Sequence, residues 1–365
     1  FFSAKLYHFG GLLVNDTDAA DSLAHPVIDH NYVFRDPVVG GELSWSSNVL
    51  SFSRDGTSGS SQVLSSDMNR MVTEVKWRRR FTDAVGITYT PFGELRGDVY
   101  QINYDYNDPT NPNAPNLDDT FLRGLATGGA TVSYPWVANI GATSHVIEPI
   151  GQIVAHNASG KQDGLPNEDA KSLVFDDTNL FDTNKFSGYD RFETGVRANV
   201  GVQYTFQGPI GYTRLLAGQS FHLSGRNAYD EDTLAFSRQS GLENDKSDYV
   251  LGAYIAPTDV FRVISQSRFD QDDLSLNRQE LAAVFSYGPL AASTSYTYSR
   301  LLDESPSVPP GTFDVQQDIV ASATLRLTDR WTLSGSARYD LETSHRLRES
   351  ITLAYLDECF MLSAT

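Results

Sequence analysis

The chain has 365 residues, with 46 acidic and 28 basic side chains, so its formal net charge at pH 7 is −18. No basic stripe offsets this charge, which argues against a nucleic-acid partner. The single cysteine, Cys359, excludes an internal disulfide framework and a cysteine-based zinc site. The 18 Tyr and 20 Phe residues favour strands, and Tyr also suits a membrane interface.

Alternation of apolar and polar residues predicts an all-β chain. No run approaches the roughly 18 consecutive apolar residues of a membrane helix, and helical spacing with caps appears nowhere convincingly. Period-two alternation, at least partial, predicts strands at 1–14, 28–35, 40–54, 68–81, 86–104, 124–138, 143–156, 191–206, 210–223, 248–256, 258–269, 277–287, 289–300, 313–328, 330–341, 346–356 and 358–365.

The segment 191–206 shows this alternation most clearly. Its length exceeds the roughly 5–6 residues of a strand in a globular sheet and matches the roughly 9–11 residues of a tilted transmembrane strand. One face would therefore meet lipid and the other water. In this strand and in 313–328 and 330–341, the polar residues that we expect to face a hydrated lumen are Arg197, Asn199, Gln203, Arg326, Arg338 and Asp340.

Short and long connections alternate along the whole chain. Short turns, for example 139–142 and 207–209, are separated by longer polar loops, for example 105–123 and 224–247. Outer-membrane barrels have short periplasmic turns and long extracellular loops, so this alternation predicts an antiparallel transmembrane β-barrel. A soluble sandwich or solenoid is the alternative. Seventeen strands is an odd number, whereas bacterial single-chain barrels have an even number, so we expect residues 1–365 to be an incomplete part of a larger barrel.

Three further features of the sequence bear on chemistry. The loop 157–190 is polar but contains several aromatic residues, which predicts a folded lid. The acidic pairs in 176–177 and 272–273 lack the spacing of an EF-hand loop, so solvated acids are favoured over a metal site. Ser220 and His222 share a strand face, but no Gly-x-Ser-x-Gly motif supports a hydrolase. We expect no catalytic residue, metal or cofactor.

Several short segments together resemble one known family. They are Asp29–Phe34, Trp77–Asp83, Thr90–Gly93, Leu165–Asp169, Phe186–Arg191, Gly218–Leu223 and Asp357–Phe360. These segments look like the barrel domain of the lipopolysaccharide-assembly outer-membrane protein family, LptD, and most of all like its alphaproteobacterial members. The resemblance covers nearly the whole chain. Its most specific part is the loop that contains Pro166, Asn167, Asp169, Gly188, Tyr189, Asp190 and Arg191.

The resemblance implies a function without covalent chemistry. Proteins of this family insert lipopolysaccharide into the outer leaflet of the outer membrane. A periplasmic jellyroll domain receives the lipid from a periplasmic bridge protein, and a barrel of about 26 strands opens laterally. An LptE-type lipoprotein plugs the barrel lumen. By this resemblance the jellyroll domain and most of the lateral gate would lie outside the present sequence.

The resemblance also suggests a role for Cys359. Cysteines near the carboxyl end of family members form disulfides with cysteines of the periplasmic domain. Phe360 follows Cys359 where some relatives have a second cysteine, so the resemblance allows at most one such bond here. A free thiol is the alternative. The competing functions for the whole chain are a general porin or substrate channel and, less favoured, a barrel hydrolase.

Overall fold

The computed structural model describes residues 1–8, 22–54, 67–104, 117–157, 165, 167–170, 173–230, 240–302, 312–357 and 360–364. Within these ranges the chain forms one antiparallel sheet of nineteen strands. The strands are β1 (Phe2–His8), β2 (Ser22–Val33), β3 (Glu42–Arg54), β4 (Asp67–Arg78), β5 (Phe81–Thr82), β6 (Thr88–Tyr104), β7 (Leu117–Ser133), β8 (Trp136–Ile140), β9 (Thr143–His156), β10 (Gly195–Gly208), β11 (Gly211–Ser224), β12 (Tyr249–Thr258), β13 (Phe261–Phe269), β14 (Leu276–Tyr287), β15 (Leu290–Leu302), β16 (Phe313–Arg326), β17 (Trp331–Asp340), β18 (His345–Leu356) and β19 (Met361–Ala364).

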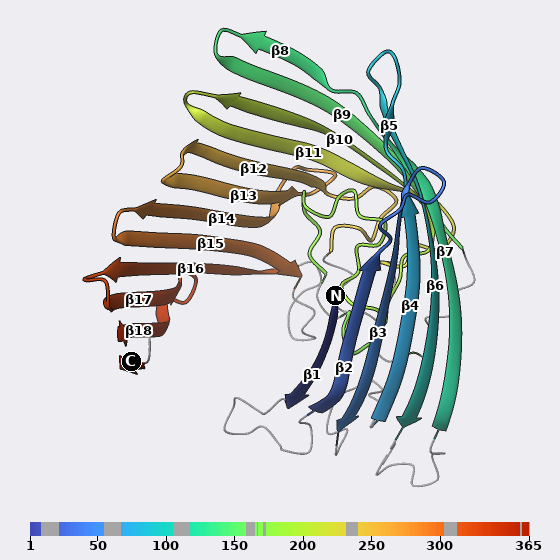
Figure 1. Cartoon of the computed structure of the whole chain (residues 1–365), viewed down its shortest axis with the longest axis horizontal. Coiled ribbons are helices and arrows are strands. Elements are labelled where there is room, and N and C mark those ends of the chain that lie inside the picture. Colours follow the sequence, from blue (N-terminus) through green and yellow to red (C-terminus); the bar gives the residue numbers. More distant parts are fainter. Residues whose placement is uncertain are drawn as a thin grey trace.

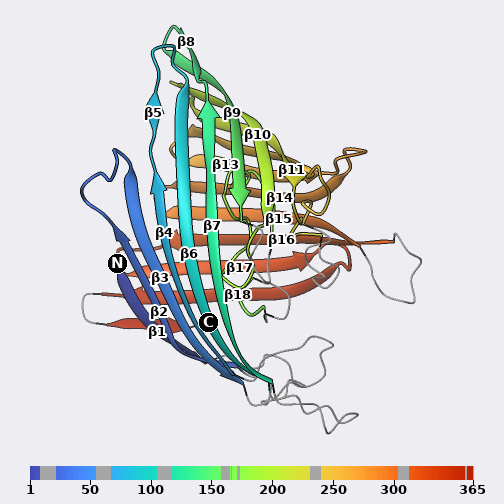
Figure 2. The same ribbon diagram turned by 90° about the vertical axis from the view of Figure 1, so that its right-hand side faces the viewer.

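The sheet is an up-and-down meander. Each strand pairs antiparallel with the next, except that β4 pairs directly with β6 and β7 with β9, because β5 and β8 are short continuations of β4 and β7 that pair with β6 and β9. The sheet curves strongly, with β1 to β7 steep, β9 to β11 inclined and β12 to β18 nearly horizontal in the view of Figure 1, and Figure 2 shows the same curvature from the side. Among the described residues no pairing joins β1 to β19. The chain is therefore a section of barrel wall whose described strands do not close.

Each of the seventeen predicted segments contains a strand, and the two further strands are short continuations at proline positions. Pro135 lies between β7 and β8. Opposite this break, the N–H of Tyr134 donates to the carbonyl of Pro149 at 3.1 Å, and the N–H of Arg79 likewise donates to the carbonyl of Pro91 at 3.1 Å beside the break between β4 and β5. A proline has no N–H to return the second bond of each pair, so the ladder is interrupted there.

The two faces of the sheet are inverted relative to a soluble protein. On β6, Leu95 is 66% exposed and Val99 is 45% exposed on the outer face, whereas Arg96, Asp98 and Tyr100 are buried on the inner face. The alternation therefore directs apolar side chains outward and charged ones inward, as in the wall of a transmembrane barrel. The predicted antiparallel all-β fold is confirmed. No helix in the described ranges is both long and apolar enough to cross a membrane.

The inner face differs between two parts of the sheet. Buried side chains occur on β2 to β13, which we call the covered wall, because segments between β9 and β10 and between β11 and β12 fold against it (Figure 1). No described residue of β14 to β19, which we call the open wall, is buried. The apolar contacts that hold the folded segments form two clusters, one with Phe175, Leu180, Phe186, Tyr229 and Leu242 and the other with Met68, Tyr100, Ile102 and Leu165.

Candidate functional site

The segment between β9 and β10 is fixed to the inner face by buried charges. Asp190 is fully buried, and its Oδ1 accepts a hydrogen bond of 2.6 Å from Nη1 of Arg70 on β4. Its Oδ2 accepts the backbone N–H groups of Glu168 at 2.7 Å and of Asp169 at 3.2 Å. Tyr100 on β6 donates its hydroxyl to Oδ1 at 3.2 Å. One carboxylate thus joins two strands of the wall to two parts of the loop.

Asp169 makes the reciprocal contacts. Its Oδ1 accepts the backbone N–H groups of Tyr189 and Asp190, each at 3.0 Å, and its Oδ2 accepts Nη1 of Arg70 at 2.7 Å. Gly188 has a φ of +70°, and a Cβ at this position would lie 2.5 Å from the Cγ of Asp169. Only glycine therefore lets the two parts of the loop approach so closely.

Two further arginines hold the carbonyl groups of the loop. Arg123 on β7 donates to the carbonyl oxygen of Tyr189 at 2.7 Å and to that of Asp190 at 3.1 Å. Arg96 on β6 also donates to the Tyr189 carbonyl, and the buried Asp98 lies between the two guanidinium groups. We call this set the loop anchor. It consists of Arg70, Arg96, Arg123, Asp98, Asp169 and Asp190, with Tyr100 and Tyr189 as hydrogen-bonding partners.

The formal charges of the loop anchor cancel, because three guanidinium groups face three carboxylates. Buried charges are tolerated only when they are paired and hydrogen-bonded. Burial opposes the ionisation of Asp190, but Arg70 and the N–H of Glu168 outweigh burial and lower its pKa. Burial and the neighbouring Asp190 raise the pKa of Asp169. The loop is therefore held to the wall by buried charges that are paired and hydrogen-bonded.

A second buried ion cluster lies at the start of β10. Glu193 is 2% exposed and lies 3.2 Å from Nε of Arg197 and 3.6 Å from Nζ of Lys185. Burial opposes its ionisation, but Lys185 and Arg197 lower the pKa of Glu193 to about 2. Burial lowers the pKa of Lys185 in spite of that carboxylate. Arg197 also donates to Oδ1 of Asn227 at 3.1 Å, which ties the segment before β12 to β10.

The six polar residues predicted to face a lumen share one face of the sheet. The pairing register from β10 through β17 places them all on the face that carries the folded segments. Arg197 and Asn199 are buried there, and Asn199 donates to Gln152 at 2.6 Å. Gln203 is half-buried. That this face lines a hydrated lumen stays a prediction.

The other three of these residues lie on the open wall. Arg326 is exposed at the end of β16. Arg338 forms an ion pair of 2.8 Å with Asp318, and this pair is accessible to solvent. Asp340 instead organises the turn after β17, where its Oδ1 accepts the N–H groups of Glu342 at 2.9 Å and Thr343 at 3.1 Å. The structure thus brings Arg197 and Asn199 into a site and leaves the other three apart from it.

The residues of the predicted family-specific loop have separate roles. Asp169, Gly188, Tyr189 and Asp190 belong to the loop anchor or its turn, as described above. Arg191 is buried and donates to the carbonyl of Leu165 at 3.0 Å. Asn167 and Ala170 exchange hydrogen bonds of 2.9 and 3.0 Å, which forms a local turn. Pro166 and Cys359 lie outside the described residues.

In the described part of the chain, neither the Ser/His hydrolase nor the acidic metal site has the side-chain geometry that its chemistry requires. The hydroxyl of Ser220 donates to Asn199 at 2.6 Å, and His222 donates from Nε2 to the carbonyl of Gly225 at 3.1 Å, so no hydrogen bond joins the pair. Asp273 accepts the N–H of Ser275 at 2.7 Å within a turn. No group of three or more His, Cys, Asp or Glu side chains in the described ranges could hold a metal ion.

Sequence reasoning missed the wall half of the loop anchor. Arg70, Arg96, Asp98, Tyr100 and Arg123 all occupy alternating positions within strands, where they look like ordinary water-facing residues. A signal was present, because charged side chains recur on the polar faces of β4, β6 and β7, whereas β15 has mostly Ser and Thr there. That signal does not reveal which loop the charges contact.

Comparison with known proteins identifies the family. Residues 1–331 match the family model LptD, "LPS transport system D". The chain is 24% identical over 207 residues to the LPS-assembly protein LptD of Acinetobacter baumannii, which is 55% of this chain and 24% of that protein. It is 36% identical over 85 residues to the LPS-assembly protein LptD of Acinetobacter baylyi, which is 22% of this chain and 10% of that protein. The chain thus spans a quarter or less of the length of these curated relatives.

Two of the solved structures to which the chain is similar are receptors. A mutant of the ferric enterobactin receptor PfeA of Pseudomonas aeruginosa has a TM-score of 0.47 and 11% identity, over 98% of this chain and 58% of that one. The siderophore receptor PirA of Acinetobacter baumannii has a TM-score of 0.45 and 10% identity, over 97% of this chain and 61% of that one. On the match of residues 1–331, this chain belongs to the LptD family of lipopolysaccharide transport, whose members are non-enzymatic proteins of the outer membrane.

Proposed function

We propose that this chain forms part of the wall of a translocon that inserts lipopolysaccharide into the outer leaflet. The inverted faces of the sheet support a wall between lipid and a polar interior. The loop anchor is the observation that carries the proposal. It holds the described residues of the segment 165–194 over the inner face with buried ion pairs, so protein fills this part of the interior.

The filled interior distinguishes the proposal from a general porin. A porin has a water-filled lumen that solutes cross freely. In the covered wall, the apolar cluster around Phe175, Leu180 and Tyr229 excludes water from the inner face instead. A bulky amphipathic lipid requires a path that opens sideways to the membrane, and a fixed loop on one side of the wall leaves such an opening to another part of the barrel.

The open wall is the part of the interior that could receive a plug protein. Its inner face carries small hydroxyl side chains, and Ser293 and Ser322 are 2.8 Å apart, as are Ser336 and Ser350. The same face also carries charged side chains, among them the ion pairs Arg278–Glu280 and Arg338–Asp318. We propose that an LptE-type lipoprotein covers it, because no described segment of this chain does.

The remaining parts of the proposal concern sequence beyond this chain. The complete barrel would have about 26 strands and would open laterally between its first and last strands. A periplasmic jellyroll domain would receive lipopolysaccharide from the bridge protein. Cys359 would form one disulfide with that domain. These statements are supported by the family to which the chain belongs.

Affinity purification of the full-length protein from outer membranes tests the proposal. Lipopolysaccharide and a lipoprotein are expected to co-purify, and the purified complex is expected to conduct ions poorly in a planar bilayer. Free ion conduction without a co-purified lipoprotein would identify a porin instead. The variant Asp190→Asn should increase conduction by releasing the loop, while Arg78→Gln serves as a control that breaks only the exposed ion pair with Glu42 on the covered wall.

A further inference from the structure

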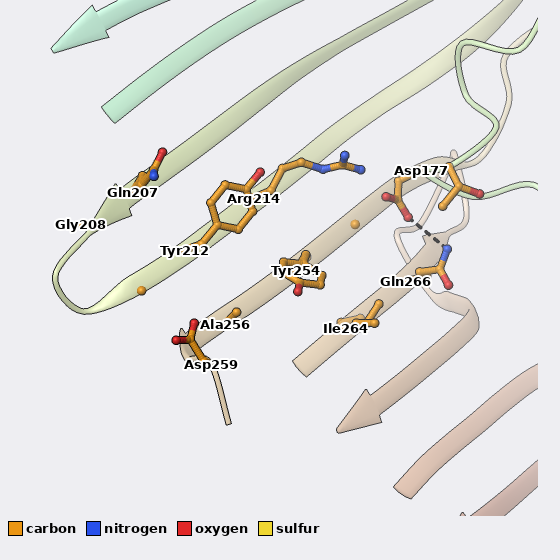
Figure 3. Close-up of a pocket in the computed structure, with 15 residues that line it drawn as sticks. Asp177, Gln207, Gly208, Tyr212, Arg214, Tyr254, Ala256, Asp259, Ile264 and Gln266 are labelled. Carbon is orange, nitrogen blue, oxygen red and sulfur yellow. Dashed lines mark hydrogen bonds between the residues drawn. The ribbon is translucent and has the colours of Figure 1, made fainter. Parts of the chain in front are cut away.

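A pocket of about 760 Å³ lies on the inner face beyond the loop anchor. Its floor is formed by β11, β12 and β13 near their short turns, and its rim includes Asp177 and Thr178 from the folded segment (Figure 3). Glycine makes this geometry possible. A Cβ on Gly252 would lie 2.0 Å from the carboxylate of Asp177, so any larger residue would displace the rim.

The side chains around the pocket combine aromatic rings with polar groups. Tyr212 and Tyr254 meet edge to face with their ring centres 5.9 Å apart. Arg214 pairs with Tyr254 across the ladder and projects between the tyrosines and Asp177 in Figure 3. On β13, the side-chain amide of Gln266 donates a hydrogen bond of 3.4 Å to the carboxylate of Asp177 at the rim. These groups offer hydrogen-bond donors, acceptors and apolar ring surface within one concave site.

Arg214 is the group that defines the charge of the ligand. It is exposed on the inner face, and in the described ranges no hydrogen bond or ion pair holds its guanidinium group. A guanidinium group can bind a phosphate or carboxylate through two parallel hydrogen bonds. In contrast, the other arginines of the covered wall discussed above form buried ion pairs with aspartate or glutamate; they are Arg70, Arg96, Arg123 and Arg197.

Other ligand classes fit the pocket less well. Two carboxylates, Asp177 and Asp259, would repel an extended polyanion, and because they lie at opposite ends of the pocket in Figure 3 they make a poor site for a divalent cation. An acyl chain would leave the polar groups without partners. A pyranose ring satisfies both kinds of surface, since its hydroxyl groups bond to the carboxylates and the amide while its C–H face lies on an aromatic ring.

We propose that this pocket binds a saccharide unit that bears a phosphate or carboxylate group. Arg214 binds the anion, and Tyr212 and Tyr254 contact the sugar ring. Asp177 accepts hydrogen bonds from the hydroxyl groups of the sugar, and the amide of Gln266 can donate to them or accept from them. The inference deepens the proposed function, because a lipopolysaccharide passing along this wall would present such sugars to the inner face. The pocket would hold the polar part of the cargo beside the ordered loop.

The test uses the purified full-length protein in detergent and small probes, with binding measured by saturation-transfer NMR. N-acetylglucosamine 1-phosphate and galacturonic acid are expected to bind, and uncharged N-acetylglucosamine to bind at least tenfold more weakly. Arg214→Gln should weaken the two anionic probes by about tenfold or more, as expected for loss of a charge-assisted pair. Arg214→Lys should retain part of the affinity, because it keeps the charge without the fork geometry.

Controls separate the pocket from other causes. Arg262→Gln removes an exposed arginine on the same face of β13, outside the pocket lining, and should leave binding unchanged. Circular dichroism verifies that each variant keeps its sheet. Unchanged binding in a folded Arg214→Gln variant would overturn the inference, as would inorganic phosphate competing as well as the sugar phosphate. Because these probes are not lipopolysaccharide, failure here leaves the co-purification test of the proposed function intact.

Discussion

The covered wall and the open wall are built from strands with the same alternation, but among the described residues only the covered wall holds folded segments of the chain against its inner face. In the covered wall, polar positions carry Arg70, Arg96, Asp98 and Arg123, and these side chains are buried against the loop. In the open wall, no described side chain is buried, the corresponding positions of β15 and β17 carry mostly serine and threonine, and the Arg338 side chain of the Arg338–Asp318 pair is 51% exposed. The backbone ladder is therefore common to both regions, and what distinguishes the covered wall is charge that is buried against a loop.

This difference has an energetic meaning. An exposed ion pair contributes about 0–1 kcal/mol, because water screens it. Removal of one member of a buried, paired set costs about 3–5 kcal/mol, since it leaves a charge without compensation in a poorly solvated site. The loop anchor should therefore respond strongly to single substitutions, while the open wall should tolerate them. Four variants test this contrast.

The largest effect is expected for Asp190→Asn. The substitution removes the fully buried carboxylate that bonds Arg70, Tyr100 and the N–H of Glu168, and it leaves three arginines facing two aspartates. We expect a loss of about 3–5 kcal/mol of stability at the loop anchor. Urea unfolding in lipid vesicles measures the global part, and limited proteolysis of the segment 165–194 measures local release. Wild-type protease resistance in the variant would show that the anchor is not what fixes the loop.

A pH effect of similar origin is expected from Glu193. Its pKa falls from an ordinary value of 4.5 to about 2 in the folded chain, so its contribution to stability is present above pH 4.5 and is lost as the pH falls through about 2. The full contribution is about 3 kcal/mol at neutral pH. Glu193→Gln should remove this contribution. The difference in unfolding free energy between wild type and variant should therefore shrink between pH 6 and pH 2, and a constant difference would contradict the assignment.

Gly188→Ala should produce an intermediate effect. Gly188 has a φ of +70°, and the added Cβ would lie 2.5 Å from the Cγ of Asp169, so strain and collision act together. We expect a cost of about 1–3 kcal/mol, seen as a lower urea midpoint. Gly335→Ala on β17 is the matched control in the open wall, because its nearest neighbour would be 3.7 Å away. Equal costs at the two sites would remove the distinction between the regions.

The smallest effect is expected for Arg338→Gln. The Arg338–Asp318 pair has a separation of 2.8 Å, but the arginine side chain is 51% exposed. Its removal should change the unfolding free energy by less than about 1 kcal/mol, and added salt should reduce even that difference. A cost comparable to that of Asp190→Asn would mean that another molecule covers the open wall in the preparation, which can be checked by mass determination of the detergent complex.

The sequence predicted the fold more completely than the site. Alternation located every one of the seventeen expected strand segments, because the register of a strand with one lipid face and one polar face is fixed by its side chains. Of the lid predicted at 157–190, residues 173–190 are folded and make apolar contacts through Phe175 and Leu180, whereas residues 158–164, 166, 171 and 172 lie outside the described residues. The ladder breaks opposite Pro91 and opposite Pro149 became meaningful only when the paired strands were aligned.

By itself, the sequence determined the class of fold, the antiparallel order of the strands and which face of each strand is apolar. These properties depend on neighbours in the chain and on a period of two. Tertiary structure alone decided that Arg70, Arg96 and Arg123, on three separate strands, contact residues 169, 189 and 190 of one loop. Such contacts join residues 66 to 120 positions apart, and no local pattern specifies them.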